Sequence, residues 1–224
     1  MTNKNWERPE VEYYQQTIRS KIPGYDLIYE QMLAIMKTHF IPQDILIVGA
    51  GGGQELHVLG EQYPQATYTA LDPSRRMLEL AKQRMNNRSL KIDWQQITID
   101  KLSSEKEYDM VTCHLILHFL KEEKAAVINQ ISQRVKAGGI LFISAIVEEE
   151  KDNTLPYWLQ HMQLYNVSAS DCKKFEESFD KTTHPLSASL LLQALNANGF
   201  ETVLPYFKSY AMEAYVAKKE RKGW

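Results

Sequence analysis

The sequence has little cysteine and no long hydrophobic run. Its 224 residues include only Cys113 and Cys172, far apart and without His or Cys neighbours at metal-ligand spacing. We therefore expect neither a disulfide framework nor a metal site. No apolar stretch approaches the ~18–20 residues of a membrane-spanning helix, and the first residues lack the apolar core of a signal peptide. These absences predict a cytoplasmic protein with no membrane contact.

The sequence also lacks a strong charge of either sign. A formal net charge of −2 provides no general attraction to nucleic acid, so a tRNA partner is possible but not favoured. Hydrophobic residues make up 44% of the chain, which is enough for a core without disulfides. The length fits one domain with appendages, and nothing indicates an oligomeric state.

Apolar strand patterns alternate with helix patterns through the middle of the chain. Strands are predicted at 44–48, 67–71, 90–96, 108–113 and 139–146, and helices at 53–62, 74–86 and 121–136. This alternation is typical of a parallel sheet with helices on both faces. A helix at 187–198 then precedes strands at 200–207 and 210–217, and the short link Lys208-Ser209 makes this pair antiparallel. The predicted fold class is α/β: a doubly wound, mostly parallel seven-stranded sheet with an antiparallel final strand pair.

Two segments lie outside this alternation. Residues 6–40 have helical periodicity interrupted at Pro23-Gly24, and residues 148–183 are polar with scattered aromatics. The second segment is too long for an ordinary connection and is predicted to form helices over the binding edge. We predict one domain, 1–224, with a helical cap (1–42), a cofactor-binding core (43–147), a lid insertion (148–186) and a final helix with the strand pair (187–218).

A glycine-rich turn follows the first predicted strand. The run from Ile45 to Glu55 breaks into glycines at positions 49, 51, 52 and 53, and glycine lets a backbone approach a ligand closely. The second strand ends in Asp72, and a carboxylate placed there after a glycine turn is typical of ribose binding. Gln54 stands where a dinucleotide fingerprint needs a small residue, which disfavours a nicotinamide or flavin cofactor.

These features occur in an order that resembles class I S-adenosylmethionine-dependent methyltransferases with a Rossmann-like fold. The matching segments are 48–53, 70–74, 108–111, 117–120 and 135–141, within a resemblance that runs from about residue 12 to 218. The resemblance implies S-adenosyl-L-methionine as cofactor and S-adenosyl-L-homocysteine as product. The cofactor contacts that it implies are Gly49, Ala50, Gly51, Gly53, Asp72, Pro73, Met77 and Cys113, with either Thr98 or Asp100 at the adenine.

One branch of the family matches more closely. The segment Arg19-Ser20-Lys21-Ile22-Pro23-Gly24-Tyr25 resembles the carboxy-S-adenosylmethionine synthases of tRNA wobble-uridine modification, which implies that Arg19 and Tyr25 lie at the cofactor. That branch also uses a downstream arginine for the extra carboxylate, and no arginine occurs here between positions 135 and 220. Lys173 and Lys174 are the nearest substitutes, and lysine lacks the planar fork that suits a carboxylate. An ordinary methyltransferase is therefore favoured.

A second departure lies at Ile47, where relatives usually carry an acid that orients the methionine end of the cofactor. The aliphatic side chain leaves the cofactor's amino group in need of another partner. A non-catalytic S-adenosylmethionine-binding module is thus a further alternative.

Methyl transfer requires alignment of the acceptor and exclusion of water, and needs a base only if the acceptor loses a proton. His114 follows the fourth strand and is the candidate base, with simple packing as an equal alternative. His118 is expected in the core, and His161 and His184 at the surface. The expected acceptor is a small molecule or a modified nucleoside.

Overall fold

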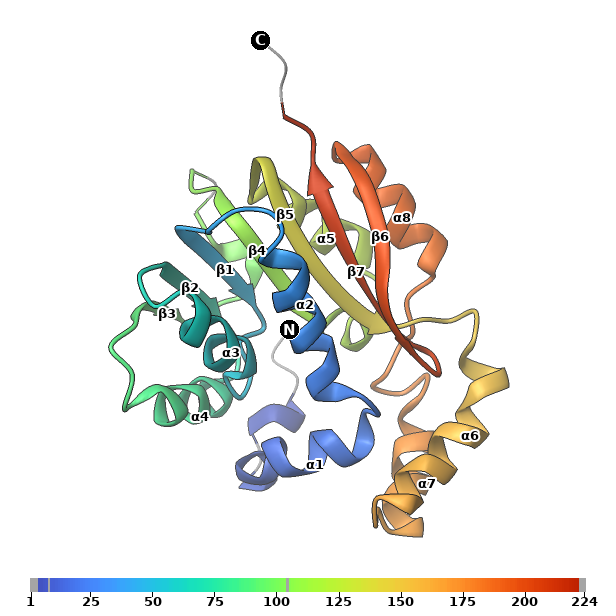
Figure 1. Ribbon diagram of the computed structural model, residues 1–224. Helices are drawn as coiled ribbons and strands as arrows, with labels where there is room; N and C mark the ends of the chain where they lie inside the picture. The colour runs from blue at the N-terminus through green and yellow to red at the C-terminus, as the bar shows by residue number, and fades with distance from the viewer. Residues whose placement is uncertain (1–3, 8, 104, 222–224) are drawn as a thin grey trace.

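The computed structural model describes residues 4–7, 9–103 and 105–221, and its strands form a single sheet (Figure 1). The order across the sheet is β3-β2-β1-β4-β5-β7-β6. The strands are β1 (Asp44–Val48), β2 (Thr67–Leu71), β3 (Lys91–Gln95), β4 (Tyr108–His114), β5 (Val135–Ile146), β6 (Phe200–Ser209) and β7 (Met212–Lys219). Strands β1 to β5 pair in parallel, whereas β7 is antiparallel to both β5 and β6. This confirms the predicted fold class.

Helices cover both faces of the sheet. The α-helices are α1 (Tyr14–Lys21), α2 (Tyr25–Met36), α3 (Gln54–Gln62), α4 (Arg75–Met85), α5 (Lys124–Gln133), α6 (Lys151–Leu164), α7 (Ala169–Ser178) and α8 (Ala188–Ala197). Short 3-10 helices are η1 (Lys4–Glu7), η2 (Pro9–Tyr13), η3 (Ile99–Lys101) and η4 (Leu117–Phe119). In β1, Ile45 and Ile47 belong to the core under α2 and α3, and Leu46 and Val48 to the core under α5 and α8. Burial on both faces explains the continuous apolar strands.

Two predicted boundaries are wrong. The final hairpin turns at Tyr210-Ala211 instead of Lys208-Ser209, because the ladder continues to the pair Ser209–Met212. Tyr210 adopts a φ of 53°, a conformation that its sequence did not suggest. Strand β5 begins at Val135, four residues before the predicted start at 139. The strand continues through Gly138 and Gly139, where its pairing with β4 changes register.

Helices α1, α6 and α7 lie beyond the end of the sheet where β1 and β4 end, whereas α2 runs across one face of the sheet (Figure 1). We call this end of the sheet the carboxyl-terminal edge. The indole Nε1 of Trp158, on α6, donates a hydrogen bond of 2.7 Å to the backbone oxygen of Lys21 at the end of α1. Trp158 is fully buried, and its ring stacks on Tyr210 of the hairpin. Residues distant in sequence thus meet beside the candidate site.

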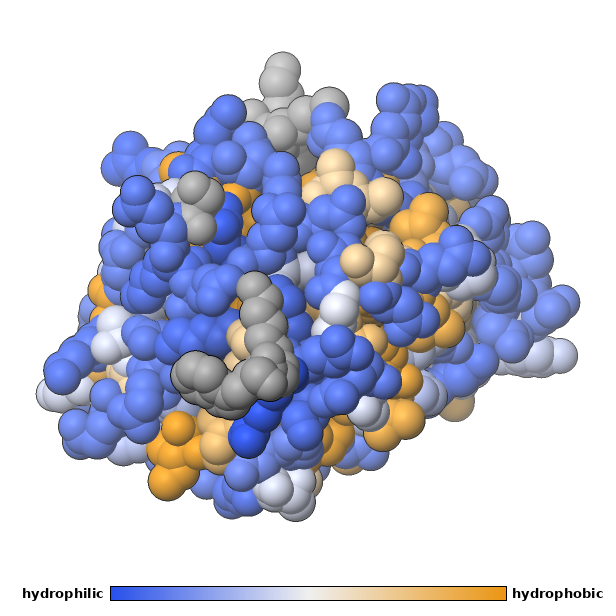
Figure 2. All heavy atoms as spheres, turned by 90° about the horizontal axis from the view of Figure 1, so that it is seen from above, coloured by the Kyte–Doolittle hydropathy of each residue, from blue (hydrophilic) through white to orange (hydrophobic). Residues whose placement is uncertain are grey.

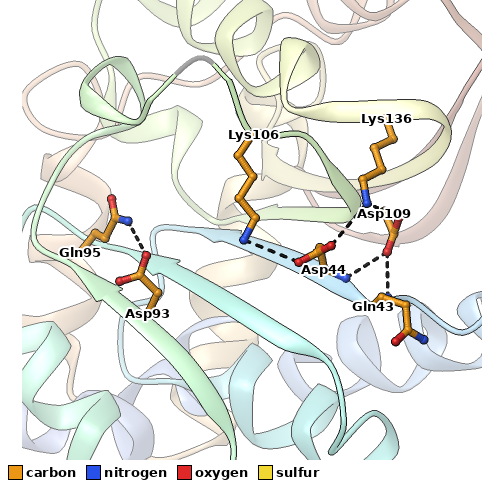
Figure 3. Close-up of polar contacts among 7 residues, drawn as sticks. All are labelled: Gln43, Asp44, Asp93, Gln95, Lys106, Asp109 and Lys136. Atoms are coloured by element: carbon orange, nitrogen blue, oxygen red, sulfur yellow. Dashed lines mark hydrogen bonds and ion pairs between the residues drawn. The ribbon is translucent and has the colours of Figure 1, made fainter.

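The opposite, amino-terminal edge carries paired charges (Figure 3). Asp109 accepts hydrogen bonds from the backbone amides of Gln43 (2.8 Å) and Asp44 (2.9 Å) and from Lys136 Nζ (2.8 Å). Lys106 Nζ lies 3.6 Å from the Asp44 carboxylate. The face seen from this side is largely hydrophilic (Figure 2). In the part of the chain that the structure describes, no helix is long and apolar enough to cross a membrane.

Candidate cofactor site

The glycine turn joins β1 to α3 and depends on its glycines. Gly49, Gly51 and Gly53 have φ angles of 75°, 47° and 77°, a region that side chains with a Cβ rarely adopt. A Cβ at Gly49 would also clash with the side chain of Ile116. The backbone amides of Gly49 and Ala50 donate to the Leu71 oxygen at 2.8 and 2.7 Å, which fixes the turn to the end of β2.

Asp72 lies directly beside this turn. Its Oδ2 accepts from the Gly51 amide at 2.9 Å, and its Oδ1 accepts from the Ser74 amide at 2.8 Å. The residue is 7% exposed, and burial raises the pKa of its carboxyl to about 6 although the two amide hydrogen bonds lower it. Because each carboxylate oxygen has two lone pairs, both can still accept from a hydroxyl.

The start of α4 holds the Asp72 carboxylate through Ser74. The Ser74 hydroxyl caps the helix by accepting from the Met77 amide at 3.2 Å. Met77 is buried, and its methyl group would lie 3.3 Å from a Cβ at Gly51. Pro73, between Asp72 and the cap, is half-buried. The structure therefore brings these residues together around the turn.

Thr98 and Asp100 occupy the next position along the same edge, after β3. Their side chains hydrogen-bond to each other, and Asp100 also pairs with Lys101 at 3.2 Å. The hydrogen bond from Thr98 lowers the pKa of Asp100. Since β3 pairs with β2, this exposed unit is next to Asp72 in the sheet order. The two alternatives for the adenine contact thus form one unit.

The N-terminal segment covers the turn. The Gln15 amide donates to the Gly52 oxygen at 3.0 Å, and the Ser74 hydroxyl donates to the Trp6 oxygen at 2.8 Å. Glu7 accepts from the Arg75 amide at 2.9 Å. Three contacts from separate parts of the cap therefore converge on the glycine turn and the start of α4.

Arg19, on α1, and Tyr25, at the start of α2, contact each other near the glycine turn. The Arg19 guanidinium makes a two-pronged ion pair with Asp26, with both N–O distances 2.8 Å, and lies 5.3 Å from the centre of the Tyr25 ring. Gln54 accepts from Arg19 and donates to Asp26, each at 3.3 Å. The residue that breaks the dinucleotide fingerprint thus connects α3 to the cap.

A tyrosine–glutamate cluster fills the space between the cap and β4. We define it as Tyr14, Tyr25, Tyr29, Glu55 and His114. The Tyr25 hydroxyl lies within electrostatic range of the Tyr14 and Tyr29 hydroxyls, and burial raises the pKa of all three. The Tyr29 ring meets the Tyr25 ring at 5.2 Å and the His114 ring at 5.3 Å, both edge to face. Helix α2 therefore supplies a row of rings that ends at His114.

Glu55 is the acid of this cluster and is 4% exposed. It lies in the first turn of α3, two residues after the last glycine. Burial, with a smaller contribution from the nearby Asp72 carboxylate, raises the pKa of its carboxyl to about 8, although a backbone hydrogen bond and Arg84 lower it. Analysis of the sequence did not single out Glu55, because an acid in the first turn of a helix is common and usually exposed.

His114 is held by the neighbouring strand. Its Nδ1 lies 3.0 Å from the Ser144 hydroxyl, which also accepts from the Leu115 amide at 3.2 Å. The hydroxyl can donate to Nδ1 or accept from it, so the direction of this bond depends on the tautomer of the ring. Nε2 is buried without a partner among the described residues, and burial lowers the pKa of the ring to about 3. Burial therefore keeps the ring neutral, and the role of His114 as a base stays a prediction.

The remaining candidates are placed as follows. Cys113 is a fully buried residue of β4, and burial raises the pKa of its thiol. His118 is buried in the core as predicted, whereas His161 and His184 are half-buried instead of exposed. His161 Nδ1 lies 3.1 Å from the Tyr210 hydroxyl, and the His184 amide donates to the His118 oxygen. The first contact holds the His161 ring, whereas the second holds the backbone of His184.

The residues present fit a nucleoside cofactor. A glycine cradle that a Cβ would fill faces Asp72, whose oxygens retain free lone pairs. Comparison with known proteins agrees: residues 46–141 match the family described as a methyltransferase domain. The chain is 24% identical over 208 residues to an uncharacterised protein of Rickettsia prowazekii, covering 92% of this chain and 79% of that one. It is 33% identical over 125 residues to a ubiquinone biosynthesis O-methyltransferase of Rickettsia typhi, covering 54% and 50%.

Solved structures show the same fold. The magnesium protoporphyrin IX methyltransferase of Synechocystis, with bound S-adenosylhomocysteine, has a TM-score of 0.65 at 17% identity, covering 97% of this chain and 92% of its own. The N-methyltransferase NodS of Bradyrhizobium japonicum, bound to the same ligand, has a TM-score of 0.62 at 15% identity, covering 93% and 98%. The chain spans about half the length of the curated ubiquinone methyltransferases that it matches. Residues 46–141 thus match a methyltransferase domain, and the chain has the fold of these methyltransferases.

Proposed function

We propose that this protein transfers a methyl group from S-adenosylmethionine to a small molecule or a modified nucleoside. The observation that carries the proposal is Asp72, a buried carboxylate held against the glycine turn with lone pairs to spare. The named relatives that support it act as O-methyltransferases in ubiquinone biosynthesis and on malonyl-acyl carrier protein. Their acceptors differ, so the acceptor here is proposed only by class.

In this proposal the chain's own residues bind and shield the reactants. Asp72 accepts from the ribose hydroxyls, and the turn from Gly49 to Gly53 contacts the ligand through its backbone. Either Thr98 or Asp100 contacts the adenine. The bound cofactor supplies an activated methyl group, so alignment and exclusion of water are the tasks left to the protein. His114, at the end of β4, would offer Nε2 to the acceptor.

Two sets of contacts weigh against the carboxylated-cofactor alternative. The guanidinium of Arg19 is already engaged by Asp26 through two hydrogen bonds. Lys173 and Lys174 lie on the exposed side of α7, where they pair with Glu177 and Asp171. Neither lysine is placed to hold an extra carboxylate at the site. Mass spectrometry of any ligand that co-purifies would identify the carboxyl group by its added mass.

Calorimetric titration with S-adenosylhomocysteine tests the proposal. We expect the wild-type protein to bind, and Asp72→Asn to weaken binding by about 100-fold, because hydrogen bonds to a charged acceptor contribute about 1.5–3 kcal/mol each. Asp93→Asn is the matched control, since Asp93 is an exposed carboxylate on neighbouring β3 that contacts Gln95. Absence of wild-type binding at millimolar ligand would refute the proposal, and equal affinities of the two variants would remove Asp72 from the site.

A further inference from the structure

We propose that the tyrosine–glutamate cluster is a cation site, in which Glu55 binds the α-ammonium group of the cofactor's methionine end. This inference rests on the proposed function, because it assumes that the glycine turn and Asp72 bind the nucleoside part of the same molecule. It assigns a recognition role to a residue that lies outside the glycine motif and its strand-terminal acid.

The first support is that the Glu55 carboxylate has no cation and no side-chain partner among the described residues. It is 4% exposed, and no described side chain donates a hydrogen bond to it or forms an ion pair with it. The first-turn amides of α3 favour a negative charge, but a buried carboxylate without a cation is costly. A buried acid beside a binding site, without an internal cation, is the arrangement expected when the ligand supplies the positive charge.

The second support is the chemistry of the surrounding groups. Glu55 raises the pKa of groups on α1, α2, β4 and β6, which places them within electrostatic range of its carboxylate: Tyr14, Tyr25, Tyr29, Cys113 and Tyr206. Each of these groups is neutral at pH 7, and the tyrosine rings present electron-rich faces and hydroxyl oxygens. Phenol rings together with a carboxylate are the groups that proteins use to hold ammonium ions.

The third support is the position of the basic residues. Arg84, on α4, lowers the pKa of Glu55 and so lies within electrostatic range, but it forms no ion pair with Glu55 among the described residues. Arg19 is turned outward and engaged by Asp26. Asp72, on the other side of the turn, adds a second negative charge that raises the pKa of Glu55. The site thus holds two carboxyl groups, and the cation of a ligand would balance part of their negative charge.

The binding equilibrium should therefore release a proton. Glu55 has a pKa of about 8 in the free protein, so roughly 90% of the molecules carry a proton there at pH 7. An ammonium group beside it favours the ionised form and lowers its pKa, and the proton leaves to the buffer. Affinity should accordingly rise about tenfold per pH unit between pH 6 and 8 and become level above pH 8.

The experiment measures proton release by titrating S-adenosylhomocysteine at pH 7 in buffers of low and high ionisation enthalpy. We expect close to one proton released by the wild type and almost none by Glu55→Gln, with at least tenfold weaker binding in the variant. Glu61→Gln is the matched control, because Glu61 lies on the same helix but is exposed and paired with Arg88. This control should behave as the wild type.

A second ligand separates recognition from a structural role. Methylthioadenosine keeps the nucleoside and the thioether but has no ammonium group, so Glu55→Gln and wild type should bind it equally and without proton release. Weaker binding of methylthioadenosine by Glu55→Gln would overturn the inference, as would wild-type binding of S-adenosylhomocysteine without proton release. Either result would leave the proposed function standing, whereas failure of the wild type to bind both ligands would refute the proposed function itself.

Discussion

The carboxylates at the two edges of the sheet have opposite environments. At the amino-terminal edge, Asp109 has two amide donors and Lys136, and these contacts lower its pKa although burial alone would raise it. At the carboxyl-terminal edge, burial raises the pKa of Glu55 and Asp72, and neither has a cation as partner among the described residues. The first edge is satisfied within the protein. At the second edge, Glu55 and Asp72 are left without a cation, which is typical of a site where a ligand supplies the missing positive charge.

The largest expected difference between the edges concerns how the free energy of unfolding changes with pH. The folded-state pKa of Glu55 is about 8, above the usual 4.5, so the folded protein binds more protons than the unfolded chain between these values. Its free energy of unfolding should then fall as pH rises from about 4.5 to 8 and stay level above. Because one pKa unit corresponds to about 1.4 kcal/mol, Glu55→Gln should gain a few kcal/mol relative to wild type at pH 9.

Urea unfolding at pH 5 and pH 9 measures this effect. The advantage of Glu55→Gln should shrink toward zero at pH 5, where the wild-type acid is protonated in the folded state. A variant that is less stable than wild type at pH 9 would show that the ionised carboxylate has a partner within the protein.

The next effect belongs to the satisfied edge. Asp109→Ala should lower the free energy of unfolding by about 2 kcal/mol, because it leaves two backbone amides and Lys136 without their acceptor. The sign with pH is opposite to that of Glu55: the stabilisation by Asp109 is present above its unfolded pKa and is lost as the carboxylate protonates at lower pH.

Thermal and urea unfolding of Asp109→Ala should be compared with Lys106→Ala. Lys106 is half-exposed and 3.6 Å from Asp44, and such an ion pair contributes less than about 1 kcal/mol. Affinity of Asp109→Ala for S-adenosylhomocysteine should equal that of the wild type. A marked loss of affinity would mean that the two edges are coupled.

The smallest expected effect comes from alanine substitutions at one glycine from each edge of the sheet. Gly49 and Gly199 have nearly the same φ, 75° and 78°, but a Cβ at Gly199 would meet nothing within 4 Å. Gly199→Ala should therefore cost only about 1 kcal/mol of backbone strain and keep ligand affinity. Gly49→Ala adds the clash with Ile116 inside the turn, so it should bind S-adenosylhomocysteine more weakly. Calorimetry on both variants checks this, and equal affinities would show that the turn adapts.

Patterns among neighbouring residues predicted the strands, the turn and the helix start that surround the site. The alternation of apolar strands with helices placed β1 to β4 within one residue of their ends, and glycine spacing marked the turn whose φ angles require glycine. Ser74 was recognisable as a helix cap from its place after Asp72-Pro73. Each of these features depends on neighbouring residues, so the sequence contains the information directly.

Features that depend on tertiary contacts were not predictable in this way. The burial of Glu55 depends on α2 and the cap lying over it, and these elements precede it by some twenty to forty residues. The pKa of His114 depends on burial and its proton position on Ser144, one strand away. The wrong hairpin turn has the same origin, because the ladder and not the local sequence decides where β6 ends.

The bond between the Trp158 indole and the Lys21 oxygen gives the protein a built-in optical signal. This indole is fully buried and stacks on Tyr210, so its fluorescence reports a dry environment while α6 rests against the end of α1. Any separation of these two elements breaks the bond and brings the ring into water, which shifts its emission to longer wavelength. A variant that keeps only Trp158 of the four tryptophans would report such a separation without interference.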